Sequence, residues 1–256
     1  MEKDREFFKG IYQIETEFDG EKAKFPIFYY DASSITGIFL AKVSKLRKIM
    51  PKKEYYPLTI FPGIGLLAIT AFEYRDTDIR PYNELSISIP MSYKSRPFIP
   101  ATKMLSCFLR SEFHVYIHHL PVTTKIALNG GVIVYNYPKF IGNIEFEERE
   151  KGIYVKLEEK NELILTMVAK KIKAEKSQIM RYVTYPVKDG KAHHADVLLN
   201  AINFGFSFNP SNLQIELGKN HKIAKDLNEL IIYKRPFHYQ YLPKFQAILY
   251  GPNRLE

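Results

Sequence analysis

The sequence predicts a mainly β protein, a β-rich α+β fold with a large antiparallel sheet or barrel and a few helices. The chain of 256 residues contains 18 tyrosines and 18 phenylalanines, and aromatic residues favour strands. Short apolar or alternating segments recur between glycine, proline and asparagine residues, whereas only two segments show helical spacing. Neither a linker nor an internal repeat interrupts this pattern, so we expect one domain over residues 1–256.

The expected strands are short and closely spaced. They cover residues 58–61, 66–72, 84–90, 113–120, 132–137, 144–148, 153–157, 163–169, 182–187 and 196–208. Asn129-Gly130-Gly131 indicates a turn between two of these strands, and Lys151-Gly152 indicates a hairpin turn. The strand that starts at Glu84 alternates polar and apolar residues, which places Glu84, Ser86 and Ser88 on one face.

Two segments have the spacing of helices. Four apolar residues from Leu40 onward recur at every third position within residues 33–50, which predicts an amphipathic helix that Pro51 ends. A second helix is predicted over residues 221–230. Residues 94–103 contain two prolines and are expected to form a loop.

The composition of the chain indicates in which cellular compartment the protein is expected. The one cysteine, Cys107, rules out an internal disulfide framework and suits a reducing cytosol. The start of the chain lacks the apolar stretch of a signal peptide. Prolines and glycines break the longest apolar run, residues 55–72. We therefore expect a cytoplasmic protein without a membrane anchor.

The net charge of +9 would suit a polyanion such as RNA, or an anionic small molecule. The basic residues are spread along the chain and interleaved with acids, as between residues 145 and 160. A solvated basic surface explains this distribution, so we expect no nucleic-acid partner. His114 and His118 would share one face of a strand, but the sequence identifies no third ligand, so no metal site is predicted.

One lysine stands out because of its neighbours. Lys139 follows Pro138 and lies among Tyr135, Tyr137 and Phe140. An ammonium group that loses its water in apolar surroundings has a lowered pKa, and the neutral amine is a nucleophile that can form a Schiff base with a ketone. Taken alone, a solvated lysine at the end of a strand is the alternative.

A Schiff-base lysine also needs an acid or a base for proton transfer. Glu84 is the candidate, because it follows Tyr82-Asn83 at the start of the alternating strand. A solvated glutamate at the edge of a sheet is the alternative.

These residues occur in segments that resemble the acetoacetate decarboxylase family. Pro81-Tyr82-Asn83-Glu84 precedes an alternating strand, and Tyr137-Pro138-Lys139 follows later in the chain. Residues 46–51, 185–190 and 210–215 are similar to further segments of the family, in the same order. The resemblance implies an antiparallel β-barrel or cone wrapped by additional sheet, and a homo-oligomer.

The resemblance also implies the chemistry. In this family, itself a standard example of an activated lysine, a lysine condenses with a β-keto acid and no cofactor is used. Carbon dioxide then leaves as the iminium accepts the electrons. Carried over by position, Lys139 would be the Schiff-base lysine, and Glu84 the acid that assists proton transfer or positioning. Tyr82, Tyr137 and Phe140 would contact the substrate.

The chain departs from the family pattern at several positions. Phe140 replaces the family's second lysine, and Tyr30-Asp31-Ala32-Ser33 stands where the family has a substrate-binding arginine. The family's additional acid is absent near Ile69, and Val132-Ile133 replaces an Arg-Glu pair. Without the second lysine, burial alone would have to lower the pKa of Lys139.

The sequence therefore predicts a carboxy-lyase-like enzyme that acts on a β-keto acid or a ketone through a lysine Schiff base. An anionic substrate would need Arg75, Arg80 or Arg181 in place of the family's arginine. Two alternatives stay open. One is a Schiff-base aldolase or dehydratase of the same superfamily, which needs the iminium but no carboxylate clamp. The other is a small-molecule-binding barrel without catalysis.

Overall fold

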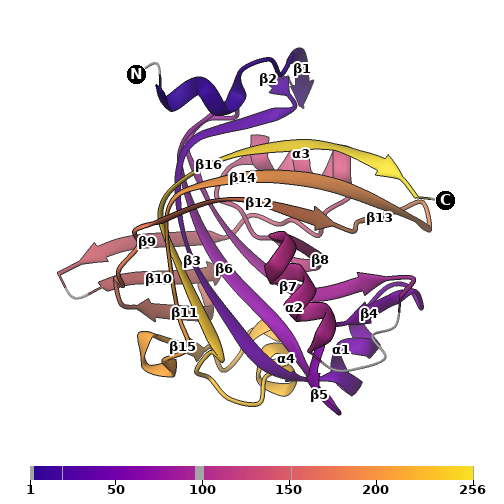
Figure 1. Cartoon of the computed structure of the whole chain (residues 1–256), viewed down its shortest axis with the longest axis vertical. Helices are drawn as coiled ribbons and strands as arrows, with labels where there is room; N and C mark the ends of the chain where they lie inside the picture. The colour runs from indigo at the N-terminus through magenta and orange to yellow at the C-terminus, as the bar shows by residue number, and fades with distance from the viewer. Residues whose placement is uncertain (1–2, 19, 96–100, 151, 256) are drawn as a thin grey trace.

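A closed barrel of seven strands forms the centre of the computed structural model, which describes residues 3–18, 20–95, 101–150 and 152–255 (Figure 1). The strands follow one another around the barrel as β7 (Tyr82–Tyr93), β8 (Glu112–His119), β12 (Lys176–Thr184), β14 (Lys191–Ser207), β16 (His238–Arg254), β3 (Ile27–Lys42) and β6 (Ile64–Thr77). Pairing of β6 with β7 closes the barrel. The β8–β12 pair is parallel and the other pairs are antiparallel. The predicted mainly β barrel is confirmed, with this one parallel pair as an addition.

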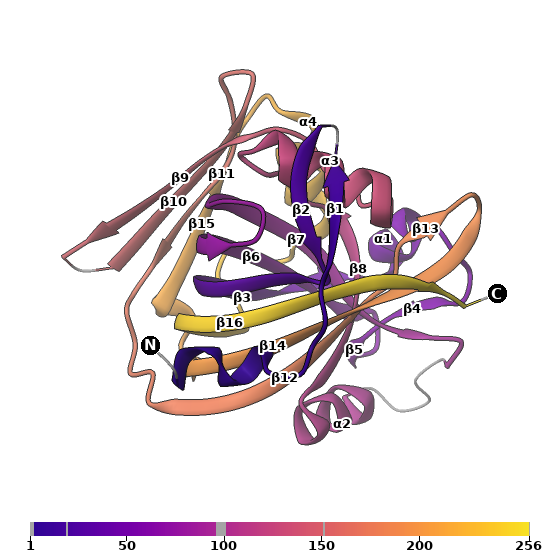
Figure 2. The same ribbon diagram turned by 90° about the horizontal axis from the view of Figure 1, so that it is seen from above.

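A second, four-stranded antiparallel sheet lies on one side of the barrel (Figure 2). It consists of β9 (Asn143–Arg149), β10 (Gly152–Glu159), β11 (Glu162–Ala169) and β15 (Leu213–Leu217). Its residues Val155, Leu157 and Met167 are completely buried in one core with Leu85 and Ile87 of β7. The β9–β10 hairpin matches the prediction, although Lys151 of its turn lies outside the described residues.

Alternate side chains of β7 lie in two different environments, the core between the barrel and the second sheet and the interior of the barrel. Leu85 and Ile87 point outward into the core between barrel and sheet, whereas Glu84, Ser86 and Ser88 point into the barrel. The three polar residues share one face, as predicted. That face lines an internal cavity, so both faces of the strand are buried.

Shorter elements surround this frame. The further strands are β1 (Ile14–Phe18), β2 (Glu21–Phe25), β4 (Tyr55–Pro57), β5 (Thr59–Phe61) and β13 (Val187–Lys188). The helices of the described ranges are α1 (Val43–Ile49), α2 (Thr102–Arg110), α3 (Lys125–Tyr135) and α4 (Lys222–Leu230), with 3-10 turns η1 (Lys3–Phe8) and η2 (Pro210–Asn212). Helix α4 confirms the helix predicted over residues 221–230. None of these helices is both long and apolar enough to cross a bilayer.

The helix predicted over residues 33–50 is wrong for most of its length. Strand β3 continues to Lys42, and only α1 is helical before the chain reaches Pro51. The β-branched side chains of Ile35 and Thr36 favour a strand. Ile35 is buried in the outer core while Thr36 faces the cavity, so the two-residue period of a strand with two buried faces overrides the three-residue spacing.

The strand predicted over residues 132–137 is also wrong, because α3 covers most of it and includes both glycines that suggested a turn. The helix ends at Asn136, whose φ of 54° is the left-handed conformation that asparagine tolerates. Part of the loop predicted over residues 94–103, residues 96–100, lies outside the described residues, and α2 begins at Thr102.

Candidate active site

Glu84 and Lys139 are 55 residues apart in the sequence, and a short segment joins them in space. This segment, residues 120–122, forms an antiparallel bridge with Glu84. Its N–H groups donate hydrogen bonds to the carbonyl oxygens of Pro138 (3.1 Å) and Phe140 (3.0 Å). The backbone of Lys139 is therefore fixed on both sides, next to the strand that carries Glu84.

The Lys139 ammonium group and the Glu84 carboxylate form a buried ion pair. Nζ lies 2.7 Å from Oε2, and the two side chains are only 7% and 10% exposed. Charged groups taken out of water are stable only when they are paired. The pair also sets an amine against a carboxylate that can take its proton across one hydrogen bond.

Buried tyrosines surround the pair. The Tyr82 ring centroid lies 5.9 Å from Nζ of Lys139, and the Tyr82 and Tyr29 hydroxyls are 3.2 Å apart. The Tyr74 hydroxyl donates to Oε1 of Glu84 at 3.4 Å. Burial raises the pKa of Tyr74 and Tyr82 well above its ordinary value, and the negative charge of Glu84 raises it further. These hydroxyls therefore stay neutral around the pair at working pH.

Helix α3 passes close to the stem of Lys139. A Cβ atom on Gly131 would lie 2.4 Å from both Cδ and Cε of Lys139 and 3.2 Å from its Nζ. A side chain at this position would displace the lysine stem, so the glycine allows the helix backbone to approach the lysine. A Cβ atom on the neighbouring Gly130 would instead lie 3.1 Å from the Phe18 ring.

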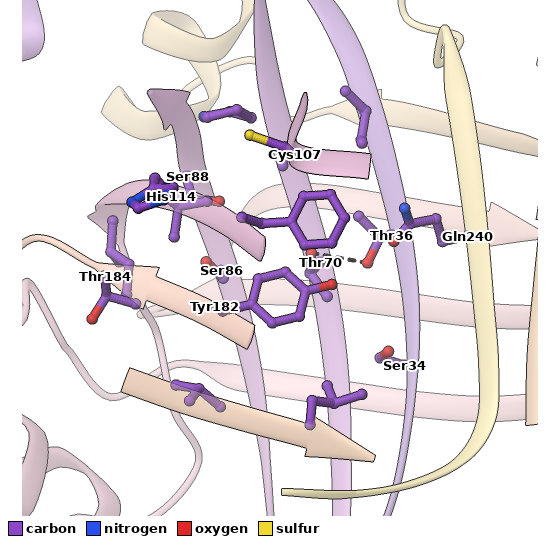
Figure 3. Close-up of a pocket in the computed structure, with 18 of the residues that line it drawn as sticks. Ser34, Thr36, Thr70, Ser86, Ser88, Cys107, His114, Tyr182, Thr184 and Gln240 are labelled. Carbon is purple, nitrogen blue, oxygen red and sulfur yellow. Dashed lines mark hydrogen bonds between the residues drawn. The ribbon is translucent and has the colours of Figure 1, made fainter. Parts of the chain in front are cut away.

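The pair opens into a cavity of about 730 Å³ inside the barrel. This volume lies toward the upper part of the range for small-molecule sites. Short polar side chains point into it from several strands (Figure 3), namely Ser34, Thr36, Thr70, Ser86, Ser88, Thr184 and Gln240. Of the cavity-lining residues that the structure describes, only Lys139 and Glu84 are lysine, arginine, aspartate or glutamate.

The three predicted substrate contacts differ in position. Tyr137 lines the cavity, and its hydroxyl lies 2.6 Å from Oγ1 of Thr184. Tyr82 stands beside the amine, as described above. Phe140 does not line the cavity and packs against the core between barrel and sheet instead. Its position does not fit the expected contact with a substrate, because its neighbour Lys139 points into the barrel while Phe140 points away.

The arginines considered as carboxylate clamps are engaged outside the cavity. Each is ion-paired: Arg75 with Asp31 and Glu73, Arg80 with Glu21, and Arg181 with Glu112 and Asp196. None of the cavity-lining residues in the described ranges is an arginine. The same ranges contain no cluster of three or more His, Cys, Asp or Glu side chains that could hold a metal ion.

Sequence reasoning missed several residues of the site. Tyr29 and Tyr74 contact the Glu84–Tyr82 region, and Thr184 bonds to Tyr137. At the end of β6, Phe72 and Tyr74 alternate with the charged Glu73 and Arg75, which would have indicated that both rings share one buried face. Thr184 gave no signal, because only the pairing of distant strands brings it to the cavity.

The sequence matches the acetoacetate decarboxylase family over residues 16–187, more than half of the chain. The chain belongs to this family. No curated protein sequence matches it significantly. Membership assigns the chain to a family of enzymes, and it accounts for the barrel wrapped by a second sheet.

Several solved structures share the fold at low sequence identity. An acetoacetate decarboxylase from Legionella pneumophila is 12% identical, with a TM-score of 0.65 over 99% of this chain and 94% of that one. Another acetoacetate decarboxylase structure is 15% identical, with a TM-score of 0.63 over 90% and 89%. The enduracididine biosynthesis enzyme MppR is 8% identical, with a TM-score of 0.64 over 90% and 87%.

Proposed function

We propose that this protein is a lysine Schiff-base enzyme that acts on a ketone or a β-keto acid, with Lys139 as the nucleophile and Glu84 as its proton-transfer partner. The observation that carries the proposal is the buried Lys139–Glu84 ion pair in the wall of the cavity. The alternative of a solvated surface lysine does not fit a side chain that is 7% exposed. Family membership supports the same chemistry.

The ion pair supplies the first steps. Transfer of a proton from Nζ of Lys139 to Glu84 leaves a neutral amine and a carboxylic acid. The amine adds to the carbonyl carbon, and the carbonyl oxygen takes the proton back from Glu84. The carboxylate then removes an N–H proton and returns it to the hydroxyl group, so that water leaves and an iminium forms.

A β-keto acid reacts onward from this iminium. The bond to its carboxylate breaks, carbon dioxide leaves, and the electron pair moves through the carbon chain to the iminium nitrogen, which gives an enamine. The enamine carbon takes a proton that Glu84 is placed to relay. Addition of water to the resulting iminium releases a ketone and restores Lys139.

A Schiff-base aldolase or dehydratase is the second candidate, and it is favoured because no arginine is among the described residues that line the cavity. An enamine that attacks an aldehyde carbon needs no clamp for a carboxylate. MppR, which shares the fold, has been solved with the condensation product of pyruvate and imidazole 4-carboxaldehyde. The cytoplasmic location and the homo-oligomeric state inferred from the sequence remain part of the proposal.

Borohydride trapping tests the proposal. The protein is treated with sodium borohydride in the presence of acetoacetate, acetylacetone or a methyl ketone, and digested for mass spectrometry. We expect one reduced adduct, on the peptide that carries Lys139, and none when the ketone is omitted. A protein in which no small ketone modifies Lys139, or in which exposed lysines react as fast, would contradict the Schiff-base mechanism.

Gly131→Ala should slow imine trapping on Lys139 by about 10- to 100-fold, because the new methyl group displaces the lysine stem and misaligns the amine. Alanine favours a helix over glycine by about 1 kcal/mol, so α3 should still form. Gly130→Ala is the matched control, since its methyl group meets Phe18 instead. Equal trapping rates in the two variants would show that the lysine does not depend on this contact.

A further inference from the structure

The register of the barrel strands divides the cavity wall into three layers. The layer at the ion pair contains Leu242, Ser34, Phe72 and Glu84, the next contains Gln240, Thr36, Thr70 and Ser86, and the third contains His238, Ile38, Ala68 and Ser88. Each layer is two residues from the next along its strands. At about 3.3 Å per residue, the wall from Glu84 to Pro90 is about 20 Å long. The cavity is therefore long as well as large.

The residues of the middle layer are polar, but several of their groups already have hydrogen-bond partners within the wall. Oγ1 of Thr36 donates to Oγ1 of Thr70 at 3.0 Å (Figure 3). Nε2 of Gln240 lies 3.1 Å from Nε2 of His238. Because these groups bond to one another, some of their polar atoms keep a hydrogen-bond partner when an apolar chain lies against them.

The far end of the cavity is aromatic and partly open. The rings of Phe108, Phe206 and Phe208 surround His238, with centroids 6.0, 5.7 and 4.8 Å from its own. Phe108 and Phe208 line the cavity, yet they are 39% and 60% exposed. Leu105 of α2 also lines it and is 59% exposed. An exposed apolar rim of this kind marks a place where apolar ligands enter or extend.

Among the described residues that line the cavity, charged side chains occur only at the opposite end, as Lys139 and Glu84, whereas Lys176 lies outside the cavity with its Nζ 4.4 Å from the Phe206 ring centroid. Burial lowers the pKa of His238 to about 4 and lowers the pKa of His114, so both cavity-lining imidazoles are neutral at pH 7. The titratable and charged groups that line the described cavity wall are thus the Lys139–Glu84 pair at one end and, elsewhere, neutral imidazole and phenol rings and the Cys107 thiol, whose pKa burial raises. A small, compact keto acid would leave most of this volume unfilled.

We propose that the substrate is an elongated, apolar carbonyl compound, a medium- or long-chain β-keto acid or methyl ketone, whose carbonyl carbon lies at Lys139 and whose chain runs past Thr36 and Thr70 to the phenylalanine rim at α2. This inference rests on the proposed Schiff-base function for the placement of the carbonyl group. The chain itself is held by the apolar wall, independently of any chemistry at Lys139.

The test is a series of methyl ketones of increasing length, with methyl propyl, methyl hexyl and methyl decyl ketone as probes. The concentration that half-saturates borohydride trapping on Lys139 should fall with each methylene group, at most about fourfold per group when burial is complete. Across the series we expect a gain of at least about 100-fold. A half-saturating concentration that does not change with chain length, or that rises with it, would overturn the inference. Adduct formation itself would still support the Schiff base.

Binding without chemistry separates the two proposals. Calorimetry on Lys139→Met measures affinity for the same ketones when no imine can form. Affinity that rises with chain length supports the elongated ligand even if wild-type protein gives no adduct, in which case only the Schiff-base proposal fails. Affinity that does not depend on length, in this variant and in trapping alike, contradicts the elongated ligand.

A cavity-filling variant locates the chain. Ala68→Phe places a ring in the third layer and should reduce binding of methyl decyl ketone at least tenfold more than binding of methyl propyl ketone. Leu109→Ser is the control, because Leu109 is 78% exposed on α2 and does not line the cavity. A selectivity ratio that is unchanged in Ala68→Phe, with an unaltered unfolding curve, would show that the chain does not occupy this layer.

Discussion

Replacing Lys139 by methionine should abolish the Schiff-base chemistry and reduce enamine formation by about 10⁴-fold or more, the scale seen when a covalent nucleophile is removed. Methionine keeps a flexible apolar stem but has no amine, so neither the carbinolamine nor the iminium can form. The measurement is exchange of the α-protons of a methyl ketone for deuterium, followed by NMR. Each exchange passes through the enamine, whatever the physiological substrate is.

Stability must be measured on the same variant. Loss of the ammonium group leaves the Glu84 carboxylate buried without its partner, and breaking a buried pair in this way costs about 3–5 kcal/mol. The double variant Lys139→Met/Glu84→Gln should regain much of that free energy and stay inactive. Activity that returns together with stability would show that Lys139 acts through the fold alone.

Lys156→Met provides the matched control for the loss of a lysine. Lys156 lies on β10 and pairs with Glu158 at 2.8 Å, but its side chain is 29% exposed and does not line the cavity. An exposed ion pair of this kind contributes less than about 1 kcal/mol. Exchange activity and unfolding should both stay close to wild type in this variant.

The two charged residues of the pair were easier to single out from the sequence than the backbone that carries them was to predict. Lys139 among aromatic residues and Glu84 on an alternating strand were both visible in the sequence, and the structure places their charged groups in contact. Their partnership depends on residues 120–122, which bridge the two segments. Nothing in the spacing of residues indicates that bridge, because a segment outside the regular strands makes it with Glu84 of β7 and with the backbone around Lys139.

Helix α3 shows how tertiary contacts override local preference. Its sequence has two adjacent glycines followed by β-branched residues, a combination that disfavours a helix. In the fold, Gly130 and Gly131 allow Phe18 and Lys139 to approach the helix backbone. The glycines that suggest a turn are thus present for packing, and the free energy that they cost the helix is offset by the buried contacts around it.

The cavity was the least predictable feature. Alternation on β7 assigned Glu84, Ser86 and Ser88 to one face, and it gave no indication that six further strands close around that face. The closure depends on long-range pairings such as β16 with β3, and on the parallel pairing of β8 with β12. A strand with one polar and one apolar face is typical of a sheet that is exposed to solvent on one side. The sequence alone therefore favours a solvent-exposed position for this polar face over a position inside a cavity.

Replacing Glu84 by glutamine should lower the kcat of α-proton exchange by about 10²- to 10⁴-fold, the usual contribution of a positioned acid–base group. The amide has nearly the shape of the carboxyl group, and its oxygen can still accept a hydrogen bond from Lys139. It cannot take the proton of the ammonium group, so the amine must lose that proton to water. The KM for the ketone should change little, because the binding site that we propose for its chain lies along the rest of the wall.

Glu84→Asp distinguishes proton transfer from a structural role. Aspartate keeps a carboxylate, but its side chain is one methylene group shorter than that of glutamate. The carboxylate would therefore lie farther from Nζ of Lys139, which is 2.7 Å from Oε2 of Glu84 in the wild-type protein. If Glu84 moves protons, Glu84→Asp should retain more kcat than Glu84→Gln, even though its packing is worse. If Glu84 only fills space and balances charge, the isosteric Glu84→Gln variant should be the more active of the two. Tyr74→Phe, which removes only the 3.4 Å hydrogen bond to Oε1, should stay within about 100-fold of wild type, because a single hydrogen bond to a charged group contributes about 1.5–3 kcal/mol. A Glu84→Gln variant that folds and exchanges protons at the wild-type rate would exclude the carboxylate from the reaction and leave the protonation of Lys139 to solvent.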